Sequence, residues 1–439
     1  MFQRQGGLRM EINVAYGKGH LAINVPDNNL SGVYRKKKMP VKDNPEQTVR
    51  EALSSPIGTN PLRDIAAGKK TACIVVNDVT RPVPNKLILP PMIEELLAAG
   101  VPREGIFILN ATGTHRPNEG DEIIELIGEE TASQYAFYNH NCFDDDMHRH
   151  VTTTASGTEV YLDIRYLDAE VKILTGLIEP HFMAGYSGGR KAICPGIASI
   201  KTVHRIHSPY FMEMRNAANC VVGENPLHQE LKGIAEKAGV DFILNVVIDE
   251  DRKLCGVFCG HFNKAHRAGI DFAIQYDMVE ADKKADIVVT SSAGYPLDKT
   301  YYQTIKGMVG ALNVAKDGGT VIIASECSEG MGNDTFVECL KKYKEIGDID
   351  KYIEYISNEN NYTPDQWQVE KLLEALRKVN ITLVTEGLSA VEKEFAGVDT
   401  APTLDDALEK AIAEHGADAA VAVIPEGPYV IPCVACSDC

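Results

Sequence analysis

Short apolar runs alternate with helical patterns along almost the whole chain of 439 residues. Runs at 70–78, 105–115 and 171–178 are nearly continuous in apolar side chains and lead into polar or glycine-rich loops. Such runs are typical of parallel strands that are buried on both faces. Helical patterns lie between them, at 92–100, directly after Pro90 and Pro91, and at 121–130. The alternation predicts an α/β fold with parallel sheets.

The alternation starts again near residue 281 and indicates a second sheet. Its expected strands lie at 285–294, 320–326, 380–387 and 419–427. A chain of this length is expected to form two or three domains. We therefore predict two doubly wound α/β domains, 1–275 and 276–425, followed by a tail, 426–439, that can pack back on the first domain.

The composition narrows the range of partners. The formal net charge is −18, whereas nucleic acids and anionic membranes require a basic surface. No run of 18 apolar residues is present, and the first 20 residues lack an apolar signal core. We therefore expect a cytoplasmic protein that binds neither nucleic acid nor membrane. Cys433, Cys436 and Cys439 have metal-ligand spacing but supply only three ligands, so a metal site there is the weaker interpretation.

Four polar clusters follow predicted strands. They lie at 77–81, 110–116, 181–191 and 294–306. Ligands of open α/β sheets collect at the carboxyl ends of strands. Three clusters belong to the first block and one to the second, so we predict an active site in a cleft between the two domains.

The segment 181–207 concentrates the most chemistry. It contains a glycine-rich turn, a lysine at Lys191 and a histidine at His207. The turn does not match a P-loop, because Arg190 stands where the final glycine is required. A glycine turn alone is more often structural, but here backbone amides and Lys191 can hold an anion while an imidazole binds a metal.

His115 and His181 both follow predicted strands and are candidates for a pair of general bases. Racemisation needs two such groups, because each enantiomer presents its proton from a different side. The segment Asp78, Val79, Thr80, Arg81 offers amides and a guanidinium that can hold a carboxylate, although an N-cap with a surface salt bridge fits equally well. In the second block, Gln303 and Lys306 are three residues apart and can point to one ligand.

With these residues assembled, the chain resembles the nickel-dependent lactate racemase family over nearly its full length. The motifs DxTR at 78–81, GTHR at 113–116, H-(x)5-SGGRK-(x)3-PG from His181 and YQxxK from Tyr302 occur in order. The spacing from His115 to His181 is 66 residues, and from Lys191 to His207 it is 16. Each motif alone is weak, whereas the set is specific.

The resemblance implies a nickel-pincer nucleotide, a pyridinium mononucleotide with two sulfur-containing arms, as cofactor. By position, Lys191 would tether it through a thioamide and His207 would be the protein ligand of nickel. His115 and His181 would be the catalytic bases. The remaining family positions are the cofactor contacts Asp78, Val79, Thr80 and Arg81 and the substrate-binding residues Arg81, Tyr302, Gln303 and Lys306.

The resemblance also implies the reaction and its requirements. A 2-hydroxy acid, lactate by default, would lose its C2 hydrogen as hydride to the cofactor, form a 2-oxo acid and regain the hydride on either face. Accessory proteins would build the cofactor. Racemases of other 2-hydroxy acids, such as malate, phenyllactate or sugar acids, remain open. A nicotinamide-dependent dehydrogenase is less favoured because no G-x-G-x-x-G turn is present, and a noncatalytic nucleotide- or metal-binding protein is a further alternative.

Overall fold

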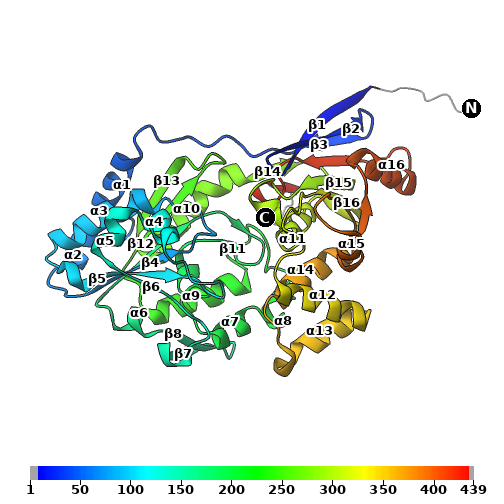
Figure 1. The fold of residues 1–439 in the computed structure, drawn as a ribbon. Coiled ribbons are helices and arrows are strands. Elements are labelled where there is room, and N and C mark those ends of the chain that lie inside the picture. Colours follow the sequence, from blue (N-terminus) through cyan, green and yellow to red (C-terminus); the bar gives the residue numbers. More distant parts are fainter. Residues whose placement is uncertain (1–7, 435–439) are drawn as a thin grey trace, which may run out of the picture. The chain divides into compact units, whose positions relative to one another are not determined.

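The structure, a computed structural model, describes residues 8–434 and divides into two compact units (Figure 1). The central unit consists of Lys38–His207 and Met214–Gln275. The terminal unit consists of 8–37, Ser208–Glu213 and 276–434. This division differs from the expected one, since the first strands and the short segment after His207 group with the C-terminal half of the chain.

The central unit is built on a six-stranded sheet of order β13-β12-β9-β4-β5-β6. Neighbouring strands are parallel except β13, which is antiparallel to β12. The bounds are Ala72–Asn77 for β4, Ile106–Ala111 for β5, Ala136–Asn139 for β6, Val171–Leu177 for β9, Phe242–Ile248 for β12 and Leu254–Gly260 for β13. The central strands β4 and β9 are almost wholly buried, as their continuous apolar sequence predicts.

Helices cover both faces of the central sheet (Figure 1). The helices are α1 (Pro45–Ser54), α2 (Leu62–Ile65), α3 (Asn85–Ala98), α4 (Asp121–Ile127), α5 (Glu129–Gln134), α6 (Ile164–Asp168), α7 (Ile200–Ile206), α9 (Pro226–Ala238) and α10 (Phe262–Asp277). The last residues of α10 belong to the terminal unit. Side chains of α1, α3 and α4 share one apolar core with β4, β5, β9 and β12. A separate hairpin is formed by β7 (His148–Thr153) and β8 (Glu159–Asp163).

One predicted helix starts earlier than its sequence indicates. We expected it to begin after Pro91, because proline lacks the N–H that a helix interior requires. Instead α3 begins at Asn85 and contains both prolines. Ile88, Leu89 and Met92 are fully buried, so packing outweighs the lost hydrogen bonds.

The terminal unit has a second six-stranded sheet, of order β18-β17-β16-β15-β19-β3, in which every pair is parallel. The bounds are Leu30–Val33 for β3, Ala285–Ser291 for β15, Ala315–Ala324 for β16, Asn380–Val384 for β17, Asp399–Ala401 for β18 and Val421–Ile424 for β19. Two parallel-strand sheets with helical crossovers confirm the predicted α/β fold class. The first half of the chain nevertheless contributes β3 to this sheet.

Helices again separate the strands of the terminal sheet. They are α8 (Pro209–Met212), α11 (Tyr301–Ala311), α12 (Asp334–Ile346), α13 (Ile349–Ser357), α14 (Gln366–Leu376), α15 (Ala390–Phe395) and α16 (Leu404–His415). One core is made by α16, the sheet and an antiparallel hairpin of β1 (Arg9–Tyr16) and β2 (Gly19–Pro26).

The described part of the tail belongs to the terminal unit. Strand β20 (Ile431–Val434) pairs in parallel with β14 (Met278–Ala281). Whether the tail also packs on the first domain stays a prediction. Cys436 and Cys439 lie outside the described residues.

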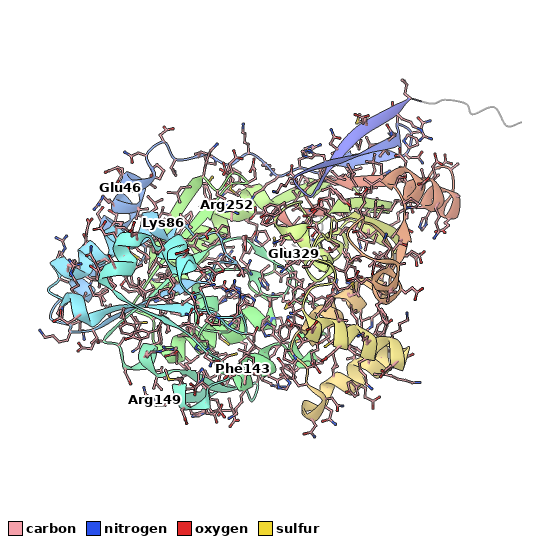
Figure 2. All side chains as sticks on the ribbon, in the orientation of Figure 1. Glu46, Lys86, Phe143, Arg149, Arg252 and Glu329 are labelled. Atoms are coloured by element: carbon pink, nitrogen blue, oxygen red, sulfur yellow. The ribbon has the colours of Figure 1, made fainter. Side chains whose placement is uncertain are left out.

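Side chains fill the space between the ribbons of each unit (Figure 2). The labelled residues Glu46, Lys86 and Arg252 are exposed residues of the central unit. Across residues 8–434, no helix combines the length and the hydrophobicity needed to span a bilayer.

Candidate functional site

The predicted site residues of the central unit follow strands at the switch point of its sheet. From β4 the chain moves outward through β5 to β6, and then returns to place β9 on the other side of β4. Loops that follow strands on either side of such a reversal diverge and leave room for a ligand. Asp78 directly follows β4, His115 follows β5 and His181 follows β9. The topology therefore brings together groups that are up to 103 residues apart in the sequence.

Asp78 and His115 form a closely paired acid and base. The Oδ2 atom of Asp78 lies 2.6 Å from Nδ1 of His115, and its Oδ1 accepts a hydrogen bond of 2.6 Å from Thr80. Burial alone would raise the pKa of Asp78, but the hydrogen bonds from His115 and Thr80 and the charge of Arg81 lower it. The ionised carboxylate fixes Nδ1 of His115 as the protonated nitrogen. The other ring nitrogen of the exposed imidazole is then the basic one.

Arg81 makes an ion pair that the sequence did not reveal. Its guanidinium donates to Oε1 of Glu179 at 2.5 Å, and both side chains are partly buried. Glu179 lies two residues before His181, so this pair joins the loop after β4 to the loop after β9. In this structure the predicted carboxylate-binding group already holds a carboxylate of the protein.

His181 and Lys191 are in direct contact. The Nζ atom of Lys191 lies 2.9 Å from Nε2 of His181. The other ring nitrogen, Nδ1, accepts from the backbone N–H groups of Met183 and Ala184 at 3.3 and 3.2 Å. Nδ1 thus faces two backbone donors, while Nε2 faces the amine of Lys191.

His207 ends α7 in a form suited to bind a metal. Its Nδ1 donates to the carbonyl oxygen of Val203 at 3.0 Å. Burial and the nearby charge of Lys191 lower its pKa to about 4, so the ring is neutral at pH 7. With the proton on Nδ1, the lone pair is on Nε2, as a histidine ligand requires. The charge effect also shows that Lys191 lies in the neighbourhood of His207.

His207 offers a single imidazole donor to a metal. Within residues 8–434, no group of three or more His, Cys, Asp or Glu side chains gathers as a metal site. A cofactor that supplies the other ligands and takes one imidazole from the protein is compatible with this arrangement.

Three predicted site residues of the terminal unit lie on α11, namely Tyr302, Gln303 and Lys306. Thr300 caps this helix, because its side chain accepts a hydrogen bond from the N–H of Gln303. The hydroxyl of Tyr302 donates to Oδ1 of Asp365 at 3.1 Å, a contact within this unit. Gln303 has a buried side-chain oxygen without a hydrogen-bond partner among the described residues. Whether Tyr302, Gln303 and Lys306 act together with the central-unit residues, as the predicted cleft requires, stays a prediction.

Two family models match the chain. The lactate racemase N-terminal domain matches residues 16–219, and the lactate racemase C-terminal domain matches residues 280–432. The chain belongs to the lactate racemase family.

Relatives of this family cover nearly the whole chain. The lactate racemase of Thermoanaerobacterium thermosaccharolyticum is 37% identical over 423 residues, which are 96% of this chain and 98% of that protein. The lactate racemase of Lactiplantibacillus plantarum is 34% identical over 427 residues, or 96% and 99% of the two chains. The family assignment confirms the predicted class of enzyme, a racemase among the isomerases.

Solved structures agree with the assignment. The lactate racemase apoprotein from Thermoanaerobacterium thermosaccharolyticum superposes with a TM-score of 0.89 at 36% identity, covering 96% of this chain and all of the other. A protein from Thermotoga maritima superposes with a TM-score of 0.66 at 18% identity, and covers 92% of this chain and 100% of its own. At that identity the second match shows the fold alone.

Sequence reasoning missed two polar residues of this lactate racemase family site. One is Glu179, the partner of Arg81, which stands out in the sequence as an acid beside a candidate catalytic histidine. The other is Asn245, whose Oδ1 accepts from the N–H of Gly189 at 2.7 Å. Asn245 is fully buried in the middle of β12, so the signal was a lone amide in an otherwise apolar strand.

Proposed function

We propose that this protein interconverts D- and L-lactate, using a nickel-pincer nucleotide tethered to Lys191. The observation that carries the proposal is the contact between Lys191 and His181, 2.9 Å apart. The predicted anchor of the cofactor thereby lies beside a predicted catalytic base, at the sheet edge that also presents His115. Membership of the lactate racemase family supports the choice of reaction.

The residues fit the cofactor at three places. Lys191 offers an amine at the end of a glycine turn, His207 offers one neutral imidazole nitrogen, and the loop from Asp78 to Arg81 offers backbone and side-chain groups. When bound, the cofactor supplies an electrophilic ring that takes the C2 hydrogen of a 2-hydroxy acid with its electron pair and returns it. The chain itself supplies binding, orientation and proton transfer.

His115 and His181 move the hydroxyl proton in the proposed reaction. As the C2 hydrogen leaves, one imidazole accepts the proton of the substrate hydroxyl and the planar 2-oxo acid forms. When the hydrogen returns to the opposite face, the other imidazole, which starts the cycle protonated, donates its proton to the oxygen, so that the two rings exchange their protonation states. Asp78 orients His115 throughout, because it accepts from Nδ1 and stabilises the imidazolium while the proton is held.

Arg81 binds the substrate carboxylate in this proposal, assisted by Tyr302, Gln303 and Lys306. Because Arg81 is paired with Glu179, the incoming carboxylate either replaces Glu179 or shares the guanidinium with it. A guanidinium has five donors in a planar fork and can hold two carboxylates. The pair therefore keeps Arg81 in place before the substrate arrives.

The reaction is tested by optical rotation. Protein produced together with the accessory proteins that build the cofactor is expected to racemise pure D- or L-lactate, and protein produced without them is expected to be inactive. A panel with malate, phenyllactate and sugar acids then defines which substrate side chain the protein accepts, because the site residues specify only the reaction centre. Absence of racemisation with every 2-hydroxy acid would contradict the proposal.

The cofactor assignment has separate tests. Intact-mass spectrometry should show an adduct that is lost in Lys191→Ala. His207→Ala should lose nickel in metal analysis while it keeps the organic mass. An adduct that persists in Lys191→Ala would place the attachment on another residue.

A further inference from the structure

Arg190, the residue before the predicted tether, carries a buried guanidinium that is paired with no carboxylate in the part of the chain that the structure describes. Its side chain is 2% exposed, and burial lowers its pKa to about 9. Among residues 8–434, its hydrogen-bond acceptors are two imidazole nitrogens and two backbone carbonyl oxygens. Burying a charge in this way costs several kcal/mol unless hydrogen bonds compensate for the lost water. A side chain that served only to fill space would not need this charge.

The two imidazoles belong to two helices that come after Arg190 in the chain. One terminal nitrogen of Arg190 lies 2.9 Å from Nδ1 of His266 in α10, and the other lies 2.5 Å from Nδ1 of His228 in α9. Nε2 of His266 donates to the carbonyl oxygen of Ser187 at 2.8 Å, so its Nδ1 is the acceptor. Burial and the charge of Arg190 lower the pKa of both histidines, that of His228 to about 3. Both rings are therefore neutral acceptors at physiological pH.

The same side chain also holds the turn on which it lies. Arg190 donates to the carbonyl oxygens of Ala184 and Tyr186, at 3.3 and 3.4 Å. On the other side of the turn, Asn245 accepts from the N–H of Gly189. A Cβ atom on Gly189 would lie 2.9 Å from the ring of His266, which shows how closely the ring packs on the turn. The turn is thus fixed by α9, α10 and β12.

Lys191 directly follows this fixed turn. Its backbone N–H donates to the carbonyl oxygen of Gly188 at 3.2 Å, at the start of a short 3-10 helix, Gly189–Ala192. The peptide between Arg190 and Lys191 therefore sets the direction in which the lysine side chain leaves the backbone. That direction places its amine next to His181.

We propose that Arg190, with His228 and His266 as neutral acceptors, is a positioning residue that presents Lys191 to the cofactor. The clamp formed by these three side chains acts through the backbone of the turn, not by touching the cofactor. Neutral acceptors suit this task, because a carboxylate in their place would also attract the lysine ammonium away from His181. The inference rests on the proposed function of Lys191 as the tether.

The test compares two substitutions of one acceptor. His266→Gln keeps an acceptor for Arg190 and a donor for Ser187, whereas His266→Phe keeps an aromatic ring and removes both. Arg190→Met removes the guanidinium, and Arg149→Met is the control, because Arg149 is an exposed arginine on β7 of the same unit (Figure 2). Each protein is produced with the cofactor pathway, and the fraction of folded protein that carries the adduct is measured by intact mass.

We expect the adduct fraction to fall at least tenfold in His266→Phe and Arg190→Met and to stay within twofold of wild type in His266→Gln and Arg149→Met. In the apoproteins, hydrogen–deuterium exchange of a peptide spanning 182–193 should be at least tenfold faster in the first two variants only. If Arg190→Met does not fold, the two His266 variants decide the question.

Two results would overturn the clamp. One is a wild-type adduct fraction in folded His266→Phe, which would make the histidine merely structural. The other is an equal loss in His266→Gln and His266→Phe, which would show that the hydrogen bonds are not what matters. Failure of the proposed function looks different: wild-type protein would carry no adduct on Lys191, while the exchange difference, which needs no cofactor, would remain.

Discussion

Each of the two six-stranded sheets has a switch point, but the two sheets differ in what fills it. In the central sheet, the loops that follow β4 and β9 carry Asp78, Arg81, Glu179 and His181, and the ion pair of Arg81 with Glu179 joins the two loops. In the terminal sheet, the corresponding strands are β15 and β19, and a hydrogen bond from a side chain to the backbone joins their carboxyl ends. Oγ of Ser291 donates to the carbonyl oxygen of Pro425 at 2.7 Å.

Gly427 makes the terminal switch point especially tight. A Cβ atom there would lie 1.7 Å from the carbonyl oxygen of Ser291. A dinucleotide in a sheet of this type occupies this position and needs a glycine-rich turn that leaves space for its phosphates. The terminal sheet thus leaves little room for a dinucleotide at this switch point. It is therefore a poor candidate for a nicotinamide site, in agreement with the missing G-x-G-x-x-G motif.

The largest effects are expected at the central switch point. His115→Ala and His181→Ala should each lower kcat/KM for racemisation by about a thousandfold, because each removes a general acid–base group. Progress is followed by optical rotation in both directions. His150→Ala, at an exposed histidine of β7, is the matched control and should retain activity. Near-normal activity in either active-site variant would remove that histidine from the mechanism.

At the switch point of the terminal sheet, we expect a substitution to change the stability of the fold and not the reaction. Gly427→Ala should lower the free energy of unfolding by about 3 kcal/mol, because the new methyl group meets a backbone oxygen and the residue has φ of +32°. Gly310→Ala in α11 is the control, since its Cβ would have only one neighbour, at 3.8 Å. Chemical denaturation measures both. A stable Gly427→Ala protein would mean that this gap can open, and would revive the nucleotide-binding alternative.

The sequence predicted where strands and helices lie better than it predicted which sheet each strand joins. Continuous apolar runs such as 171–178 and the helical spacing between them are local signals, and the parallel sheets confirm them. The pairing of β3 with β19 joins residues almost 400 positions apart, which no local pattern encodes. The prolines of α3 failed as a boundary for a similar reason, because burial of their neighbours decides the outcome.

The site shows the same division between local and long-range signals. Motif spacing was sufficient to nominate His181 and Lys191, which the structure places in contact. It gave no indication that Arg81 is paired with Glu179, 98 residues further along the chain. The clamp around Arg190 escaped notice because His228 and His266 are unremarkable as single residues and acquire meaning only through the tertiary fold.

A smaller effect is expected when the partner of His115 changes. Asp78→Asn should lower kcat roughly a hundredfold, because a neutral amide stabilises the imidazolium less and can favour the wrong tautomer. The pKa of Asp78 is lowered in the folded protein, so its ionised form contributes stability above the ordinary value of 3.8, and this contribution is lost as the pH falls through the folded pKa. The difference in unfolding free energy between wild type and variant should therefore shrink below about pH 4. A difference that is constant with pH would contradict the pairing.

The smallest effect on the reaction is expected for a substitution on α11 of the terminal unit. The side-chain oxygen of Gln303 is buried without a partner among the described residues, which costs stability unless a ligand uses it. Gln303→Met should therefore leave the unfolding free energy unchanged or raise it by about 1 kcal/mol, while KM for lactate rises several-fold. Gln368→Met is the contrast, because the amide of Gln368 donates to the carbonyl oxygen of Tyr302 at 2.5 Å. That variant should be destabilised. If Gln303→Met is destabilised as well and KM is unchanged, Gln303 is structural, and the terminal unit contributes less to substrate binding than the family motif implies.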